Sequence, residues 1–121
     1  MEQKICLDTN ILVDILKDES SPALEKIENK QIAISSITSF ELYQRETNLR
    51  DIEKLLFNID VLPFNFKASK IASDIFKDLR KRGKIIDFRD IFIASVAIAN
   101  DYKLYTLNKK HFERINGLRL F

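Results

Sequence analysis

Short apolar segments alternate along this chain with longer segments that carry the periodicity of helices. The predicted strands are residues 4–7, 31–35, 59–64, 103–107 and 118–121. The first four are separated by helical segments that are too long for hairpin connections, so these strands are expected to run parallel. A parallel sheet is covered by helices on both faces. The alternation therefore predicts an α/β domain with a mainly parallel central sheet.

The helical segments can be placed by their periodicity and by the residues at their ends. They are predicted at residues 10–17, 22–28, 38–46, 49–57, 67–82, 88–100 and 108–115. Ser21 and Pro22 suit an N-cap and a first helical position, and Gly83 is expected to end the helix before it. The segment 88–100 is apolar nearly all round, which predicts a buried helix. Pro63 places its strand near a sheet edge or at a strand end.

Size and composition favour one globular domain. The chain has 121 residues, of which 45% are hydrophobic, and this suits a single domain over residues 1–121 with a real core. No apolar run approaches the length of a membrane span. Asp8 and Asp14 interrupt the first apolar segment, so no signal peptide is predicted.

The cysteine content and the net charge bear on the cellular compartment and on the possible binding partners. Cys6 is the only cysteine, so there is no internal disulfide and no cysteine-based metal site. We expect it to be a small core residue in a protein of the reducing cytosol. The formal net charge of +2 permits nucleic-acid binding but does not argue for it.

Polar residues stand where the predicted strands end or where the next helix begins: Asp8, Glu41, Asp87, Asp90, Thr106 and Asn108. In a parallel sheet the carboxyl ends of the strands share one edge, and ligands bind there. The sequence therefore predicts an acidic pocket at this edge.

Each of these positions also has a purely structural interpretation. The triplet 8–10 offers three good N-caps, and Thr38 with Glu41 fits a capping box. Asp87 fits an N-cap and Asp90 an acid in the first helical turn. Capping explains an acid at one helix start, but it does not require acids at several starts on one edge. The joint occurrence favours a functional site.

Carboxylates gathered in one pocket repel, and burial pushes some of them toward the neutral form. A divalent cation removes this cost, and oxygen-only ligands select Mg²⁺ or Mn²⁺. Zinc is not expected, because Cys6 and His111 are the only cysteine and histidine. The chemistry that this suggests is phosphodiester hydrolysis.

Four segments, "LDTNILVDIL", "ISSITSFEL", "DFRDIFIASVAIAN" and "LYTLNKKHF", follow one another in the order and spacing of the PIN-domain family. The closest resemblance is to the VapC toxins of type II toxin–antitoxin systems, from Ile5 to about Leu118. It implies a three-layer α/β/α fold, a Mg²⁺- or Mn²⁺-dependent endoribonuclease and an RNA substrate. It also implies a homodimer and a cognate VapB-type antitoxin.

The resemblance also suggests roles for individual residues. Asp8, Glu41 and Asp90 match the family's acidic positions and are expected to be catalytic and metal-binding. Thr9 and Asn10 complete the "DTN" signature, and Thr106 matches a frequent polar partner; we expect all three to support the site.

The fourth polar position departs from the family pattern. Asn108 is a plausible ligand or water-holder, but His111 stands where an acid often stands. This departs from a complete four-carboxylate site, and Asp87 is a candidate to compensate. His111 is expected to be a solvated surface residue rather than a metal ligand.

Other families fit less well. A response-regulator receiver needs an acid at the end of a later strand, whereas Asp60 begins its strand. Haloacid-dehalogenase phosphatases need a second aspartate where Asn10 stands. The remaining alternative is an inactive PIN-like module that binds RNA or a partner. Metal-dependent cleavage would distinguish the two.

Overall fold

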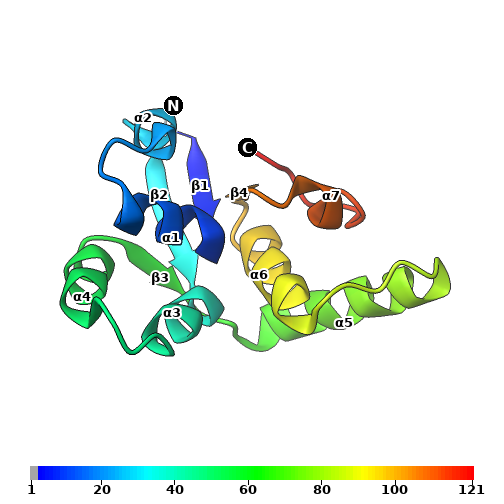
Figure 1. The fold of residues 1–121 in the computed structure, drawn as a ribbon. Coiled ribbons are helices and arrows are strands. Elements are labelled where there is room, and N and C mark those ends of the chain that lie inside the picture. Colours follow the sequence, from blue (N-terminus) through cyan, green and yellow to red (C-terminus); the bar gives the residue numbers. More distant parts are fainter. Residues whose placement is uncertain (1–2) are drawn as a thin grey trace.

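The computed structural model describes residues 3–121 and has a four-stranded sheet at its centre (Figure 1). The strands are β1 (Lys4–Leu7), β2 (Gln31–Ser35), β3 (Asp60–Leu62) and β4 (Lys103–Tyr105), in the order β3-β2-β1-β4. All three pairings are parallel, and Cys6 of β1 lies opposite Ala33 and Leu104. The prediction of a parallel sheet is confirmed.

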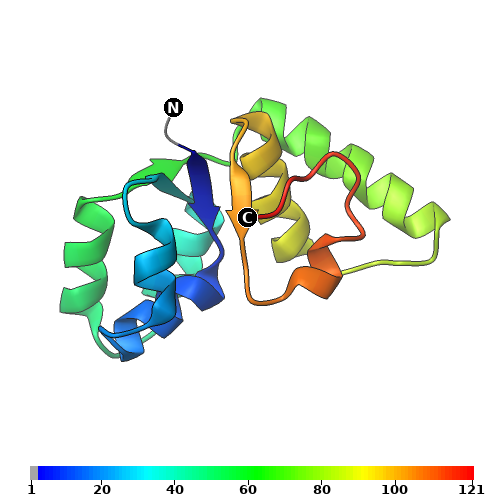
Figure 2. The same ribbon diagram turned by 90° about the horizontal axis from the view of Figure 1, so that it is seen from above.

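Helices cover both faces of this sheet. They are α1 (Thr9–Lys17), α2 (Pro22–Ile27), α3 (Ser36–Tyr43), α4 (Leu49–Phe57), α5 (Phe66–Lys81), α6 (Phe88–Ala99) and α7 (Lys109–Phe112). Figure 2 shows α1 to α4 on one side of β1 and β4, and α5, α6 and α7 on the other. The fold therefore has the three α/β/α layers that the resemblance implied. Among residues 3–121, no helix combines the length and hydrophobicity that crossing a bilayer requires.

Two hydrophobic cores lie on opposite faces of the sheet because successive strand residues point to opposite sides. Ile5 and Leu7 pack with the α1–α4 layer, and Cys6 between them packs with the α5–α6 layer. All three side chains are fully buried. Cys6 is thus the core residue that was predicted.

The predicted buried helix is α6. Its residues Ile91, Ile93, Ala94 and Ala97 belong to the core between the sheet and α5. The last turn of α6 leads directly into β4, while its first turn lies near the opposite, carboxyl edge of the sheet (Figure 1). Packing along its length therefore fixes the acids at its N-terminus.

Two strand predictions were too long, and a third was wrong. The fourth strand, predicted at 103–107, ends at Tyr105, and the Leu107 amide donates to Asn10 instead of to the sheet. The third strand ends at Leu62 because Pro63 cannot donate to the ladder, and β3 is an edge strand, as Pro63 indicated. The predicted closing strand at 118–121 is wrong. Only an isolated bridge between Leu104 and Leu120 forms there, since the chain touches the edge of β4 for a single residue.

Candidate active site

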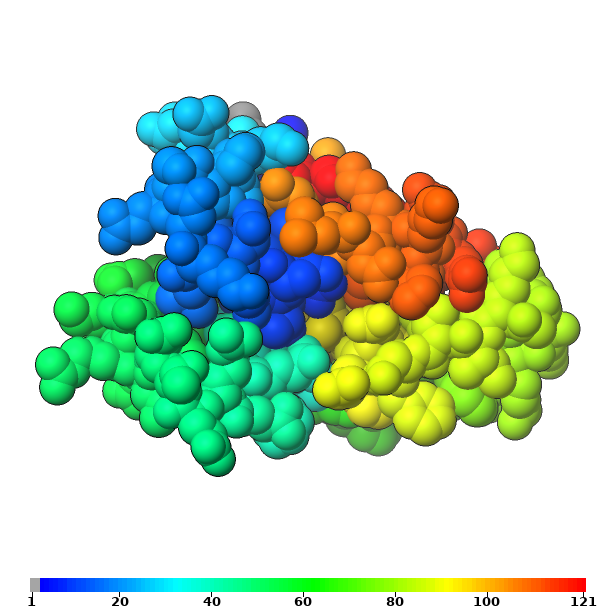
Figure 3. Space-filling model, in the orientation of Figure 1, coloured from blue at the N-terminus to red at the C-terminus, as the bar shows by residue number. Residues whose placement is uncertain are grey.

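One pocket gathers polar residues from four separate parts of the chain. Its volume is about 360 Å³, and it is lined by Asp8, Thr9, Asn10, Val13, Glu41, Asp90 and Asn108. We call it the acidic pocket. In Figure 3 the blue surface of α1, the teal of α3, the yellow of the α6 N-terminus and the orange of the segment after β4 meet near the centre of the view. The fold thus brings together Asp8, Glu41, Asp90 and Asn108.

Asp8 is both a helix cap and a wall of the acidic pocket. It is the N-cap of α1, where its Oδ1 accepts a hydrogen bond from the Thr9 amide at 2.8 Å. Its Oδ2 accepts one from the Thr106 hydroxyl at 2.7 Å. Burial raises the pKa of Asp8, and the bonds from Thr106 and Thr9 oppose that rise. The capping interpretation of Asp8 is therefore confirmed, and the same residue lines the acidic pocket.

Glu41 does not take part in a capping box. The helix α3 begins at Ser36, and its N-cap is Ser35, whose hydroxyl accepts a hydrogen bond from the Thr38 amide at 3.1 Å. Thr38 is thus the third residue of the helix and not its cap. Glu41 lies in the second half of α3, too far along the helix to reach back to a cap. The capping interpretation of Thr38 and Glu41 is wrong.

Hydroxyl groups orient the Glu41 carboxylate. The Thr9 hydroxyl donates to Glu41 Oε1 at 2.7 Å, and the hydroxyl oxygens of Thr9 and Thr38 are hydrogen-bonded at 3.1 Å. Thr38 also contacts the Ser35 hydroxyl at 3.4 Å. The sequence interpretation missed Thr38 as part of the site. Its signal was the spacing of three residues from Glu41, which places both on one helix face.

Asp90 is the most perturbed acid at the pocket mouth. Its side chain retains 23% of its exposure in the first turn of α6. Burial, followed by the negative charges of Asp8 and Asp87, raises its pKa to about 6. A carboxyl group with this pKa is partly protonated and partly ionised near pH 6, and such perturbed pKa values are typical of functional sites.

His111 lies beside the pocket and not among the residues that line it. Its Nδ1 is 3.9 Å from Asp90 Oδ2 and 2.8 Å from Asn108 Nδ2. Nδ1 is therefore within hydrogen-bonding distance of Asn108 and beyond that distance from Asp90. His111 is exposed, as expected, and its contact with Asn108 ties α7 to the pocket.

Asp87 is not among the residues that line the acidic pocket. It is the N-cap of α6, and its Oδ1 accepts from the Arg89 amide at 2.8 Å. The Arg89 guanidinium also donates to it at 3.2 and 3.3 Å, and these hydrogen bonds lower the pKa of Asp87. Arg89 Nη1 in turn lies 3.6 Å from Glu41 Oε2. The fold therefore does not bring Asp87 into the pocket as a fourth carboxylate.

The segment after β4 is locked against the start of α1. The Thr106 hydroxyl, which donates to Asp8, also accepts from the Asn108 amide at 3.0 Å. The Leu107 amide donates to Asn10 Oδ1 at 3.2 Å. Thr106 and Asn10 therefore hold Asp8 and Asn108 at the same edge of the sheet.

The donor set suits Mg²⁺ or Mn²⁺. Within residues 3–121, no three His, Cys, Asp or Glu side chains approach closely enough to form a metal site by themselves. Mg²⁺ does not need such a cage, because it keeps several waters and binds through one or two carboxylates. The charge of Asp8 raises the cost of ionising Asp90, and the charge of Glu41 raises that of Asp8; a bound cation would relieve both costs.

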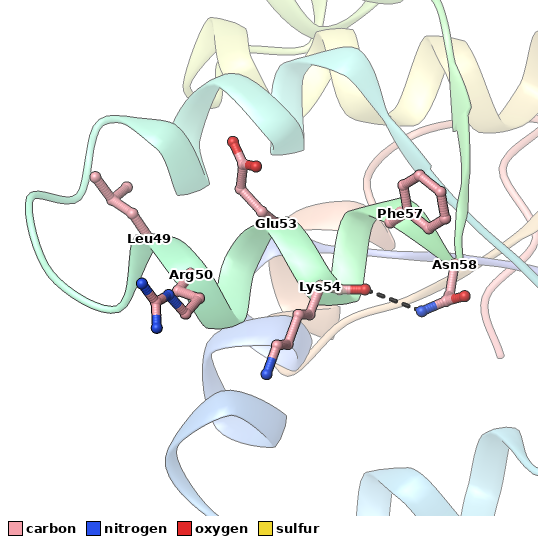
Figure 4. Close-up of a pocket in the computed structure, with 6 residues that line it drawn as sticks. All are labelled: Leu49, Arg50, Glu53, Lys54, Phe57 and Asn58. Atoms are coloured by element: carbon pink, nitrogen blue, oxygen red, sulfur yellow. Dashed lines mark hydrogen bonds between the residues drawn. The ribbon is translucent and has the colours of Figure 1, made fainter.

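Pocket size does not identify the site. A larger cavity of about 630 Å³ lies over α4, and Figure 4 shows that its lining side chains, Leu49, Arg50, Glu53, Lys54, Phe57 and Asn58, come from this one helix and the residue after it. Its lining contains a single carboxylate, Glu53, and two basic side chains, Arg50 and Lys54. The smaller acidic pocket carries the convergent chemistry.

Known proteins resemble this chain over almost its whole length. The PIN domain family model matches residues 5–118. Ribonuclease VapC1 of Methanocaldococcus jannaschii is 36% identical over 99% of this chain and 88% of that protein. The tRNA(fMet)-specific endonuclease VapC of Shigella flexneri is 32% identical over 96% of this chain and 95% of that protein.

Solved structures agree with this relationship. The toxin–antitoxin complex VapBC of Salmonella typhimurium, solved bound to DNA, contains a chain with a TM-score of 0.91 and 29% identity, covering 98% of this chain and 97% of that one. VapBC2 of Rickettsia felis gives a TM-score of 0.83 at 30% identity, covering 97% and 96%. The chain therefore belongs to the PIN-domain family, together with the VapC ribonucleases that it resembles.

Proposed function

We propose that this chain is a Mg²⁺- or Mn²⁺-dependent endoribonuclease and the toxin of a VapBC-type pair. The observation that carries the proposal is the acidic pocket, where Asp8, Glu41 and Asp90 converge from three separate segments. The family supports it, since the relatives of similar length are ribonucleases and endonucleases by name.

In this proposal Asp8 and Asp90 hold the metal ion, with Asn108 beside them. When bound, the ion supplies a Lewis acid for a phosphoryl oxygen and a nucleophilic water. Asp8 contributes a fixed orientation, because both of its oxygens accept hydrogen bonds. Glu41 is the candidate general base: Thr9 holds its Oε1, and its Oε2 faces Arg89 at 3.6 Å.

The proposed partner is a VapB-type antitoxin. Solved relatives are VapBC complexes, some of them bound to DNA. An arginine or lysine of the antitoxin would fit the acidic pocket by charge and hydrogen bonding, and would exclude both metal and RNA. We place the protein in the cytoplasm, where such RNA and such a partner meet.

The decisive experiment is a cleavage assay on single-stranded and looped RNA, whose exposed backbone can enter a recessed pocket. Purified protein with Mg²⁺ or Mn²⁺ should cut RNA, EDTA should stop the reaction, and added Mn²⁺ should restore it. Asp8→Asn and Asp90→Asn should lower both Mn²⁺ affinity and the rate by orders of magnitude. Asp74→Asn, an exposed acid on α5, is the matched control and should behave as wild type.

Glu41→Gln separates catalysis from folding. The variant should lose most activity while RNA affinity stays near that of the wild type, because the amide cannot accept a proton. Glu53→Gln on α4 is its control. Full activity of Glu41→Gln would remove Glu41 from the reaction.

The alternative is a PIN-like module that binds RNA or a partner without cleaving it. The pairing of Glu41 with Arg89 and the histidine at position 111 are the observations that favour it. Equal RNA affinity in wild type and all acid variants, with no cleavage of several RNAs, would establish this alternative and reject the nuclease.

A further inference from the structure

A second pocket lies directly beside the acidic pocket. Its volume is about 370 Å³, and it is lined by Lys26, Tyr105, Thr106, Leu107, Lys109 and Phe121. We call it the lysine cleft. A volume of this size is within the range of roughly 300–1,000 Å³ that small-ligand sites occupy, so one nucleotide unit is a reasonable occupant.

The two pockets share a wall. Thr106 lines the lysine cleft, while its hydroxyl donates to Asp8 at 2.7 Å in the acidic pocket. Leu107 lines the cleft, and its amide is bound to Asn10 of the acidic pocket. Figure 3 shows the orange surface of this segment with the blue of α1 below it and the sky blue of α2 beside it. A polymer that binds in one pocket can therefore extend into the adjacent one.

The charge of the cleft is opposite to that of its neighbour. Lys26 and Lys109 are its basic side chains, both exposed, and neither forms a salt bridge with another residue of the range 3–121. No Asp or Glu side chain of that range lines the cleft. Two unpaired ammonium groups at one cleft favour an anionic ligand.

Apart from Thr106, the rest of the lining is apolar or aromatic. Leu107 is 63% exposed and offers an apolar side chain at the cleft. The ring of Phe121 packs edge-on against Tyr105, with 5.1 Å between ring centroids, and stays half-buried. Apolar and aromatic surfaces beside basic groups are the combination that single-stranded nucleic acids require.

We propose that the lysine cleft binds the nucleotide that adjoins the scissile phosphate of the RNA. Lys26 and Lys109 hold its phosphate, and Leu107 and Phe121 form the apolar surface against its base. This inference rests on the proposed ribonuclease function and adds a substrate subsite to it. An acidic peptide of a protein partner would also satisfy the lysines, but the wall shared with the acidic pocket favours the substrate.

The test uses the double variant Lys26→Gln/Lys109→Gln and a short single-stranded RNA in EDTA, so that binding is measured without cleavage. By fluorescence anisotropy, Kd should rise about tenfold, and the slope of log affinity against log salt should fall by about 0.7, since one phosphate contact on a single strand is lost. The control Lys67→Gln/Lys81→Gln removes the same charge from α5, outside both pockets. It should change Kd less than twofold.

A modified substrate checks the contact itself. Two modified RNAs carry one uncharged methylphosphonate each, either one step to the 5′ side or one step to the 3′ side of the scissile phosphate. One of the two should bind the wild type more weakly than unmodified RNA does. The lysine double variant should not distinguish that RNA from the unmodified one. A thermal melt of each variant verifies that both exposed substitutions leave the fold intact.

The outcomes separate the two levels of the argument. Unchanged RNA affinity in the lysine double variant, or a loss no larger than in the α5 control, overturns the subsite while the wild-type nuclease stands. Normal RNA binding with lost affinity for a protein partner assigns the cleft to that partner instead. A wild type that neither binds nor cuts RNA removes the proposed function itself.

Discussion

Asp8 and Asp90 face one pocket in different environments. Asp8 is 5% exposed and accepts hydrogen bonds on both oxygens, so its ionised form is partly compensated. The Asp90 side chain is 23% exposed, and its pKa is raised to about 6 by burial and by the negative charges of Asp8 and Asp87. Asp90 is therefore the carboxyl at which protons and a metal ion compete most directly.

This difference predicts how stability depends on pH in the metal-free protein. Between about pH 4, the pKa of an unfolded aspartate, and pH 6, native Asp90 binds a proton that the unfolded chain does not bind. The free energy of unfolding should therefore fall as pH rises through this window. Asp90→Asn should remove the larger part of that fall, leaving the smaller part that comes from the raised pKa of Asp8, and should make the variant about 1–2 kcal/mol more stable than wild type at pH 7.

Urea unfolding in EDTA at a series of pH values measures this effect. Asp74→Asn serves as the control and should keep the wild-type slope. Saturating Mn²⁺ should reverse the trend in the wild type, because the ion favours the ionised carboxylates. A wild-type slope retained by Asp90→Asn would show that another group is responsible.

Thr9 predicts an effect of orientation on rate. Thr9→Val keeps the shape of the side chain but removes the hydroxyl that donates to Glu41 Oε1 at 2.7 Å. We expect a loss of about 1 kcal/mol in stability and about tenfold in kcat with little change in KM. Thr9→Ser should restore the rate. The control is Ser39→Ala, because the Ser39 hydroxyl bonds only within α3. If Ser39→Ala lowers the rate as much as Thr9→Val does, the loss comes from a disturbed α3 and not from the orientation of Glu41.

At the scale of elements, two of the helices at the pocket, α3 and α6, begin in different ways. Ser35 caps α3 from inside the core, so Glu41 emerges near the middle of that helix. Asp87 caps α6 from the exposed surface, and Asp90 follows one turn later at the pocket. In both cases the cap sets the helical phase, and the phase determines which acid enters the pocket.

The end of α5 allows a prediction on backbone strain. Gly83 has a φ of +67° immediately after the helix, and the Lys84 amide donates to the Leu79 carbonyl at 2.9 Å, which is a left-handed C-terminal cap. A Cβ at Gly83 would meet no atom within 4 Å. Gly83→Ala should thus cost only the backbone penalty of about 1 kcal/mol. Gly83→Asn, measured by the same thermal unfolding, should cost less, and equal costs would contradict this account.

At the scale of the whole molecule, large apolar side chains are exposed at the start of α5, at the start of α6 and in the loop between these helices. Phe66 is 79% exposed, Ile85 54% and Phe88 58%. Phe88 belongs to an aromatic cluster with Phe76 and Phe92. Clustered apolar side chains at the surface mark interaction sites, and we predict that this surface joins two copies in a homodimer.

Phe88→Glu tests the dimer without destabilising α6. Phe88 is the first residue of α6, where an acidic side chain is favourable. Sedimentation at micromolar concentration should give a dimer for wild type and a monomer for this variant. Phe57→Glu changes another exposed phenylalanine, 91% exposed on α4, and should remain dimeric. A monomeric wild type would end the prediction.

The amino-acid sequence by itself determined the order of strands and helices, because apolar periodicity is local. It also placed Asp8, Glu41 and Asp90 near the carboxyl ends of parallel strands, since such strands share one edge. It failed at residues 118–121, where a single bridge to β4 replaces the predicted strand. Strand formation there depends on how far the chain follows its neighbour, and composition does not encode that path.

Only the tertiary structure decided which polar groups meet. Asp87 and Asp90 stand three residues apart, yet cap geometry turns one outward and packing of α6 turns the other into the pocket. Thr9 reaches Thr38 through the packing of α1 against α3. Lys26 and Lys109 line the same cleft, although the strands β2, β3 and β4 separate them in the sequence. Such contacts arise from the crossovers that stack helices on the sheet, and no local pattern contains them.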